Sequence, residues 1–292
     1  MRGLLYGDVN LNLIDGSAIW ATSMAEAMAE AGVETTFVLK SAVTNDRLVA
    51  PLSQIQGLEV LDPFNSGLTR GRQRSMSPKE ATRVLIELDR RKSFDFHVVR
   101  GRRLSEVLAK ERHFNGRIWC YLTDIPQSLA DLNEADVKQI GLIAQHSQVL
   151  LCQTEDLRSF LESEIEHTSG KCKLWPPIVP IWSSGDDNLA LPIDLPKEGK
   201  PWRLVYLGKF APRWNTEAMT KLPQAFKKKG LTVEVHMVGD KIHDDRSDPD
   251  FADRMRAALE GTEGVIWHGG MGRASAMKLA SNMHFGLSWR DP

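Results

Sequence analysis

Short apolar runs alternate with amphipathic segments of helical length along the first 178 residues. The runs at 4–9, 35–39, 58–61, 96–99, 117–122 and 148–151 have the length and composition of β-strands. Apolar residues at helical spacing predict helices after residue 17, from Ser77-Pro78, and near 104–111, 134–146 and 155–164. Strands that alternate with helices in this way predict a parallel sheet covered by helices on both faces.

The same alternation begins again at Trp202. An apolar run at 204–207 predicts a strand that stops at Gly208, and Asn215 or Thr216 is placed to cap the helix that follows. One face of this expected helix is apolar, and it is formed by Ala218, Met219, Leu222, Ala225 and Phe226. Gly230 then ends the helix before a second strand at 233–238.

The segment 179–201 separates the two alternating halves. It is rich in proline, glycine, serine and aspartate and lacks periodicity, so it is predicted to link domains at 1–178 and 202–292. The expected fold class is α/β, with two Rossmann-like domains. The second domain would hold only about three strands, whereas a doubly wound sheet usually has about five or six. We therefore expect an incomplete second domain in a fragment of a longer chain.

Composition narrows the class of protein. The 292 residues are 42% hydrophobic and 26% charged, as in a soluble globular protein. A net charge of −1 argues against binding to nucleic acid through overall charge. Three cysteines form no CxxC pair, which fits a reducing compartment. The sequence has neither a signal-peptide pattern nor an apolar run of membrane-spanning length, so we expect a cytoplasmic protein, with peripheral contact at the inner membrane face left open.

Two basic residues follow the strand at 204–207. In an open α/β sheet, ligands bind beyond the carboxyl ends of the strands, where helix N-termini point. Lys209 and Arg213 lie at that place, and two cations beside a helix N-terminus suit a phosphate group. The alternative is a pair of solvated loop cations, but their position after a strand favours phosphate binding.

This unit resembles the second domain of retaining glycosyltransferases of the GT-B architecture, most closely glycosyltransferase family 4. The features that carry the resemblance are Gly208-Lys209 with Arg213, Ala225-Phe226 in the helix, and Val238-Gly239 after the next strand. The sequence Val265-Ile266-Trp267-His268-Gly269 matches the family's strand before its base-binding turn, and 274–280 and 285–288 match the following helix and strand. The amino-terminal half matches through Asp15-Gly16-Ser17 and through Thr123-Asp124-Ile125-Pro126, which is similar to the family's His-Asp-x-Pro.

The resemblance implies two domains that face each other across a cleft, with the acceptor on the first and the nucleotide sugar on the second. It implies transfer of a hexose, with retention, from a nucleotide-diphosphate sugar to a sugar, glycan or glycolipid acceptor. Lys209 and Arg213 would bind the diphosphate, together with the backbone amides of Gly16 and Ser17. No protein base is implied, because in this family the leaving phosphate is thought to take the acceptor's proton.

The sequence departs from the family in three places. Asp15-Gly16-Ser17 stands where a Gly-Gly loop is usual, and Thr123 occupies the position of the histidine. The family's pair of glutamates, which contacts the donor sugar and ribose, would lie after Pro292. We therefore assign no catalytic residue and expect this chain to transfer sugar poorly by itself.

Further candidates follow other strands. His268, Gly269, Gly270 and Met271 would contact the nucleobase or line the cleft, although a histidine packed at a strand end is the commoner case. Arg100, Arg102 and Asp124 are candidates on the acceptor side, weighed against solvated surface residues. Asp248 and Asp250 have the spacing of a metal-binding Asp-x-Asp, but aspartates also suit turns and caps. No histidine or glutamate accompanies them at ligand spacing, so no metal or other cofactor is expected.

Two alternatives to the glycosyltransferase remain. A sugar-nucleotide epimerase on the same fold would bind the same donor and give a different product. A truncated chain that binds a nucleotide or a partner protein without catalysis would account for the missing glutamate pair.

Overall fold

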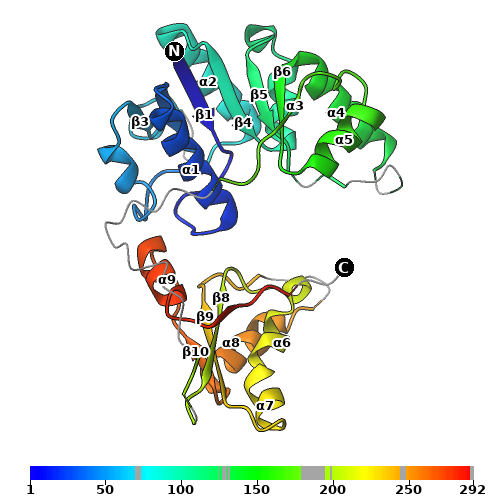
Figure 1. The fold of residues 1–292 in the computed structure, drawn as a ribbon. Helices are drawn as coiled ribbons and strands as arrows, with labels where there is room; N and C mark the ends of the chain where they lie inside the picture. Colours follow the sequence, from blue (N-terminus) through cyan, green and yellow to red (C-terminus); the bar gives the residue numbers. More distant parts are fainter. Residues whose placement is uncertain are drawn as a thin grey trace. The chain divides into compact units, whose positions relative to one another are not determined.

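The computed structural model describes residues 1–69, 74–123, 125–126, 130, 132–178, 195–197, 199–243 and 248–289. The chain divides into two compact units, Met1–Ile181 and Trp182–Pro292. Each unit is built around one parallel sheet (Figure 1), which confirms the predicted α/β fold class. Asp124 and residues 179–194 of the predicted linker lie outside the described residues. None of the described helices is long and apolar enough to cross a membrane.

The first unit contains a seven-stranded sheet in the order β3-β2-β1-β4-β5-β6-β7. Its strands are β1 (Arg2–Tyr6), β2 (Glu34–Val38), β3 (Leu58–Leu61), β4 (Phe96–Arg100), β5 (Ile118–Tyr121), β6 (Ser147–Cys152) and β7 (Cys172–Leu174). Its helices are α1 (Gly16–Glu30), α2 (Pro78–Lys92), α3 (Arg102–Ala109), α4 (Glu134–His146) and α5 (Glu155–Glu164), with 3-10 turns η1 (Pro51–Gln54) and η2 (Arg112–Phe114). The strand order reverses between β1 and β4, the switch point at which ligands bind in open α/β sheets.

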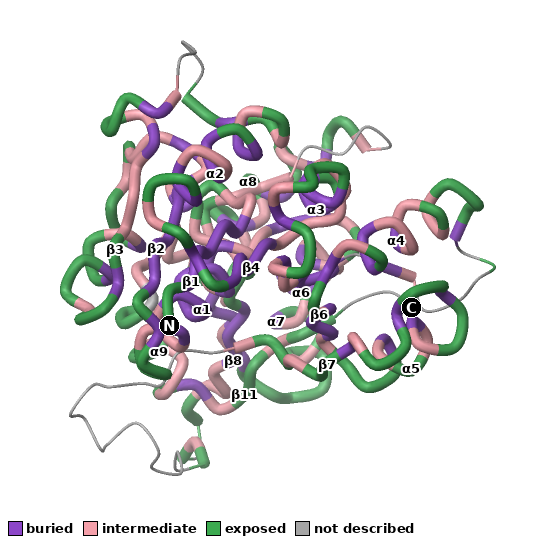
Figure 2. Tube along the Cα trace, turned by 90° about the horizontal axis from the view of Figure 1, so that it is seen from above, coloured by how far each residue is buried: buried purple, intermediate pink, exposed green. Residues whose placement is uncertain are grey.

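Apolar side chains cover both faces of this sheet. One cluster packs between the sheet and α2, α3, α4 and α5, and the other packs between the sheet and α1. The central strands β1 and β4 are accordingly buried (Figure 2). Because both faces are buried, these strands are continuous apolar runs, which is why the sequence pattern predicted them.

The second unit repeats this topology with four parallel strands in the order β10-β9-β8-β11. The strands are β8 (Trp202–Leu207), β9 (Val233–Val238), β10 (Val265–Trp267) and β11 (Phe285–Gly286). The helical segments are η5 (Pro212–Trp214), α6 (Thr216–Thr220), α7 (Leu222–Lys227), α8 (Phe251–Gly261) and α9 (Arg273–Ala280). The strand order again reverses, here between β8 and β11.

The single helix predicted after Asn215 is wrong, since the structure has two short helices, α6 and α7. Pro223 lies in the first turn of α7, where its missing N–H and its ring prevent a continuous helix. Asn215, one of the two predicted caps, does occupy the N-cap position of α6, but its side chain does not cap the helix. The Thr216 hydroxyl accepts a hydrogen bond from the backbone N–H of Ala211 at 3.1 Å.

A buried carboxylate organises the amino end of the first sheet. Asp89, near the end of α2, is only 4% exposed. Its oxygens lie 3.1 Å from Nε2 of His97 and 2.6 Å from Nε2 of His113, and they accept hydrogen bonds from Arg117 at 2.8 and 3.0 Å. Burial opposes ionisation, but hydrogen bonds from His97 and Arg117 outweigh it and hold the pKa of Asp89 below its usual range. The ion pair thus connects α2, β4 and the start of β5.

Replacing this carboxylate should destabilise the first unit in a pH-dependent way. At pH 7, Asp89→Asn should lower the free energy of unfolding by about 3 kcal/mol, because Arg117 loses its partner in a partly buried site. A carboxyl group whose folded pKa is lowered stabilises the protein above its unfolded pKa of about 3.9, and that stabilisation is lost as pH falls below it. The difference in the free energy of unfolding between wild type and variant, measured by urea titration, should therefore be smaller at pH 3 than at pH 7.

The control is Asp156→Asn, at an exposed position in the first turn of α5. It removes the same charge from the first unit without touching a buried partner. Equal urea midpoints for Asp89→Asn and Asp156→Asn at pH 7 would contradict the role assigned to Asp89.

Candidate functional site

Two residues predicted for different roles meet at the switch point of the first sheet. Ser17 lies in the first turn of α1 and Arg100 ends β4. A guanidinium nitrogen of Arg100 donates a hydrogen bond to the Ser17 hydroxyl at 2.9 Å. The guanidinium also lies 5.7 Å from the ring centre of Trp20, which stacks on Tyr121 at 4.4 Å. Burial raises the pKa of Tyr121, so this ring stays neutral beside the cation.

The N-terminus of α1 carries a carboxylate as its cap. Asp15 accepts a hydrogen bond from the backbone N–H of Ala18 at 2.9 Å. Gly16, the first residue of the helix, has no described atom within 4 Å of the place a Cβ would take, so no close contact requires glycine here. An anion at this N-terminus would meet the charge of Asp15, which the nearby Arg100 offsets.

Sequence reasoning missed an ion pair beside this cluster. Lys40 Nζ lies 3.0 Å from Oδ1 of Asp8, and the two side chains are 26% and 19% exposed. Asp8 lies two residues after the end of β1 and has a left-handed φ of 50°. Since both residues come directly after adjacent parallel strands, their shared place at the carboxyl edge is the signal that would have found them.

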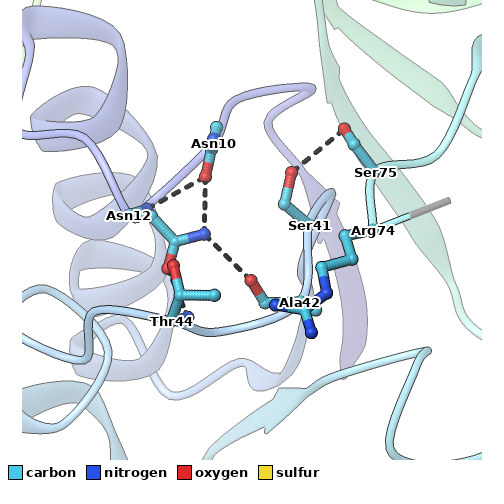
Figure 3. A pocket seen from close by; sticks show the side chains of 7 residues that line it. All are labelled: Asn10, Asn12, Ser41, Ala42, Thr44, Arg74 and Ser75. Atoms are coloured by element: carbon cyan, nitrogen blue, oxygen red, sulfur yellow. Dashed lines mark hydrogen bonds between the residues drawn. The ribbon is translucent and has the colours of Figure 1, made fainter.

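An open polar pocket of about 530 Å³ lies beyond the ends of β1 and β2 (Figure 3). Its lining comes from the loops after β1 and β2 and from the segment before α2. The lining residues are Asn10, Asn12, Ser41, Ala42, Thr44, Arg74 and Ser75. This pocket could not be predicted from the sequence, because its walls come from three loops that carry no motif.

Of the remaining acceptor-side candidates, Arg102 has its own ion-pair partner. Arg102, at the start of α3, forms an ion pair with Asp136 of α4 at 2.9 Å. This contact gives Arg102 a structural partner between two helices. Asp124 is outside the described residues.

Both predicted phosphate-binding cations follow β8 in the second unit. Lys209 is half-buried, and its carbonyl oxygen accepts a hydrogen bond from the Tyr206 hydroxyl. Arg213 lies in η5, is exposed, and its guanidinium lies 5.4 Å from the ring centre of Trp214. Among the described residues, Arg213 has no carboxylate partner, so its charge is available to an anion.

Glycines bring the strand ends of the second sheet close together. The N–H of Gly208 donates to Val238 O and that of Gly239 donates to Gly269 O, both at 2.9 Å. A Cβ on Gly239 would collide with the carbonyl oxygen of Gly208, and one on Gly270 would collide with Asp240. Lys209 and the predicted Gly269-Gly270 turn therefore share one edge, lined by backbone.

The other two predicted nucleobase candidates are packed side chains. Nε2 of His268 lies 2.9 Å from Nδ1 of His236 on β9, and the two rings stack with 13° between their planes. Burial lowers the pKa of both histidines, and the proximity of His268 lowers that of His236 further. Met271 packs on Val205 and Val238. A nucleobase role for His268 or Met271 stays a prediction.

Asp248, in the predicted Asp-x-Asp segment, is paired with an arginine. Asp248 receives two hydrogen bonds from Arg254 in α8, at 2.7 and 3.0 Å. Over the described part of the chain, no three His, Cys, Asp or Glu side chains are grouped so as to hold a metal ion. Metal independence of the proposed site stays a prediction.

The fold is shared with proteins of known structure, although no protein-family model and no curated protein matches the sequence. Sucrose-phosphate synthase from Thermosynechococcus elongatus aligns with a TM-score of 0.64 and 14% identity, over 98% of this chain and 74% of that one. HepE from Anabaena, in complex with UDP and glucose, aligns at 0.61 with 13% identity, over 98% and 73%. The UDP-GlcNAc 2-epimerase of Neisseria meningitidis, bound to UDP-GlcNAc, aligns at 0.57 with 14% identity, over 98% and 77%. At this level of identity the likeness establishes the fold, which is that of GT-B glycosyltransferases.

Proposed function

We propose that the chain is a glycosyltransferase that takes a hexose from a nucleotide-diphosphate sugar. The observation that carries the proposal is the end of β8, where Arg213 is exposed and has no carboxylate partner among the residues that the structure describes, and where Lys209 lies beside glycine-lined strand ends. This edge combines positive charge with glycines, whose lack of side chains would let a diphosphate approach the backbone closely. The shared GT-B fold, with HepE solved in complex with UDP-glucose, supports the choice of ligand.

The proposed chemistry depends on charge that develops during the reaction. When the bond between the sugar and the diphosphate breaks, the departing diphosphate gains negative charge. Fixed cations that bind this charge more strongly in the transition state than in the ground state accelerate the step. Lys209 and Arg213 would supply these cations.

We further propose that transfer proceeds with retention and without a metal, as the family resemblance implies. The acceptor would be a sugar, a glycan or a glycolipid. Proton NMR of the product made from an α-linked donor tests the stereochemistry, and a β-linked product would contradict retention. Turnover that disappears in EDTA and returns with Mn²⁺ or Mg²⁺ would contradict metal independence.

Epimerisation of the nucleotide sugar is the second candidate function. The observation in its favour is the likeness to the Neisseria epimerase at a TM-score of 0.57. Chromatography of the nucleotide sugar after incubation without acceptor separates the two functions. An epimerised donor would support the second candidate. A donor that stays unchanged without acceptor and is consumed when acceptor is added supports the transferase.

Removing the two cations should selectively weaken binding of the diphosphate. Lys209→Ala combined with Arg213→Ala should cost about 3 kcal/mol or more in UDP, GDP or ADP binding, because hydrogen bonds to charged groups contribute roughly 1.5–3 kcal/mol each. Binding of the corresponding nucleoside should change little, since it lacks the phosphates. Calorimetric titration of wild type and variant with the diphosphate and the nucleoside measures both effects.

The matched control is Lys228→Ala combined with Lys229→Ala. This variant loses the same charge at exposed positions after α7, away from the edge that holds Lys209. Equal diphosphate affinity in the two double variants would reject Lys209 and Arg213 as the phosphate ligands.

A further inference from the structure

The pocket beyond β1 and β2 has a wall that is held rigidly by one side chain. Oδ1 of Asn12 accepts hydrogen bonds from the backbone N–H groups of Thr44 and Asn45 at 2.7 and 2.9 Å. Its Nδ2 donates to Oδ1 of Asn10 and to the carbonyl of Ala42, both at 2.9 Å (Figure 3). Asn12 therefore fastens the loop after β1 to the loop after β2, and its own hydrogen-bonding capacity is used.

Several side chains of this pocket have hydrogen-bond donors to spare. Oδ1 of Asn10 already accepts from the backbone and the side chain of Asn12, whereas its Nδ2 has no partner among the described residues. The Ser41 hydroxyl donates to Ser75 Oγ at 3.0 Å, so the hydroxyl hydrogen of Ser75 is available. The guanidinium of Arg74 completes the lining and adds further donors without any acceptor.

The charge of the pocket is positive. Arg74 is exposed and has no carboxylate partner within the described ranges, and none of the residues that line the pocket is acidic. The neighbouring cation, Lys40, is already neutralised by Asp8 at 3.0 Å. A ligand with several acceptor oxygens and a negative charge complements such a site, whereas a neutral polyol would gain no charge-assisted hydrogen bond from Arg74.

We propose that this pocket binds an oxyanion group, phosphate or carboxylate, carried by the acceptor. Its volume of about 530 Å³ suits a small polar molecule, and it lies at the carboxyl edge where ligands of parallel sheets bind. Arg74 binds the charged group, and Asn10 and Ser75 donate to its oxygens. Binding of the oxyanion stands on the pocket alone, while its assignment to an acceptor rests on the proposed function.

The test uses three small probes with the full chain. Glycerol 3-phosphate, glycerate and glycerol share a polyol part and differ in their charged group. Ligand-observed NMR titrations should show saturable binding of at least one of the two anions and none of glycerol over the same range. Whichever anion binds more tightly identifies the group. Equal binding of glycerol and of both anions would overturn the proposal.

Two variants locate the site. Arg74→Gln removes the charge, and Asn10→Asp keeps the oxygen that accepts from Asn12 while it replaces the free NH₂ by a negative oxygen. Each should weaken binding of the anion about tenfold or more, because charge-assisted hydrogen bonds are lost. The control Arg90→Gln, at an exposed position in the last turn of α2, should bind as wild type does. Wild-type affinity in Arg74→Gln with an unchanged melting temperature would overturn the proposal.

A competition experiment separates this inference from the proposed function. UDP-sugar should not displace the bound anion, and Arg74→Gln should leave UDP-sugar affinity unchanged. Displacement by UDP would assign the pocket to the donor and overturn an acceptor site. Binding of the anion without binding of any UDP-, GDP- or ADP-sugar would reject the proposed function, while the oxyanion site itself would be supported.

Discussion

Parallel pairing of all strands is the constraint on which the rest of the structure depends. Every described strand pair in both sheets is parallel, so each loop that leaves a strand does so at the same edge of its sheet. Loops far apart in sequence are thereby brought together, as Ser17 and Arg100 are in the first unit and Gly208, Gly239 and Gly269 are in the second. The opposite edge carries a different chemistry, since the Asp89 network there is buried and closed.

The fold could be predicted largely from the sequence, because strands that are buried on both faces of a sheet consist mostly of apolar residues. Residues 58–61, 134–146, 155–164 and 233–238 were predicted with the bounds that the structure has. β7 was missed, since only Cys172 of its three residues is buried and no pattern results. The break at Pro223 was missed because the helical spacing of apolar residues continues across it. Here a local backbone rule overrides a pattern that depends on side chains.

The candidate site could be predicted only as far as it follows from position after a strand. Lys209 and Arg213 were found in this way, and the structure puts both after β8. Side-chain partners could not be predicted, because they depend on residues distant in the sequence. Arg102 pairs with Asp136, Asp248 with Arg254 and His268 with His236. The Asp8–Lys40 pair and the pocket beside Asn12 were not predicted for the same reason, since both are formed by loops that carry no motif.

The central claim is that the carboxyl edge of the second sheet binds a nucleotide-diphosphate sugar. Hydrogen–deuterium exchange of the full chain, with and without saturating UDP-, GDP- or ADP-glucose, tests it most directly. The account predicts that one of these donors slows exchange at residues 208–216 and 239–243, while 230–233 at the amino edge exchange as before. Slowed exchange at the amino edge alone, or an unchanged pattern with all three donors, would contradict it.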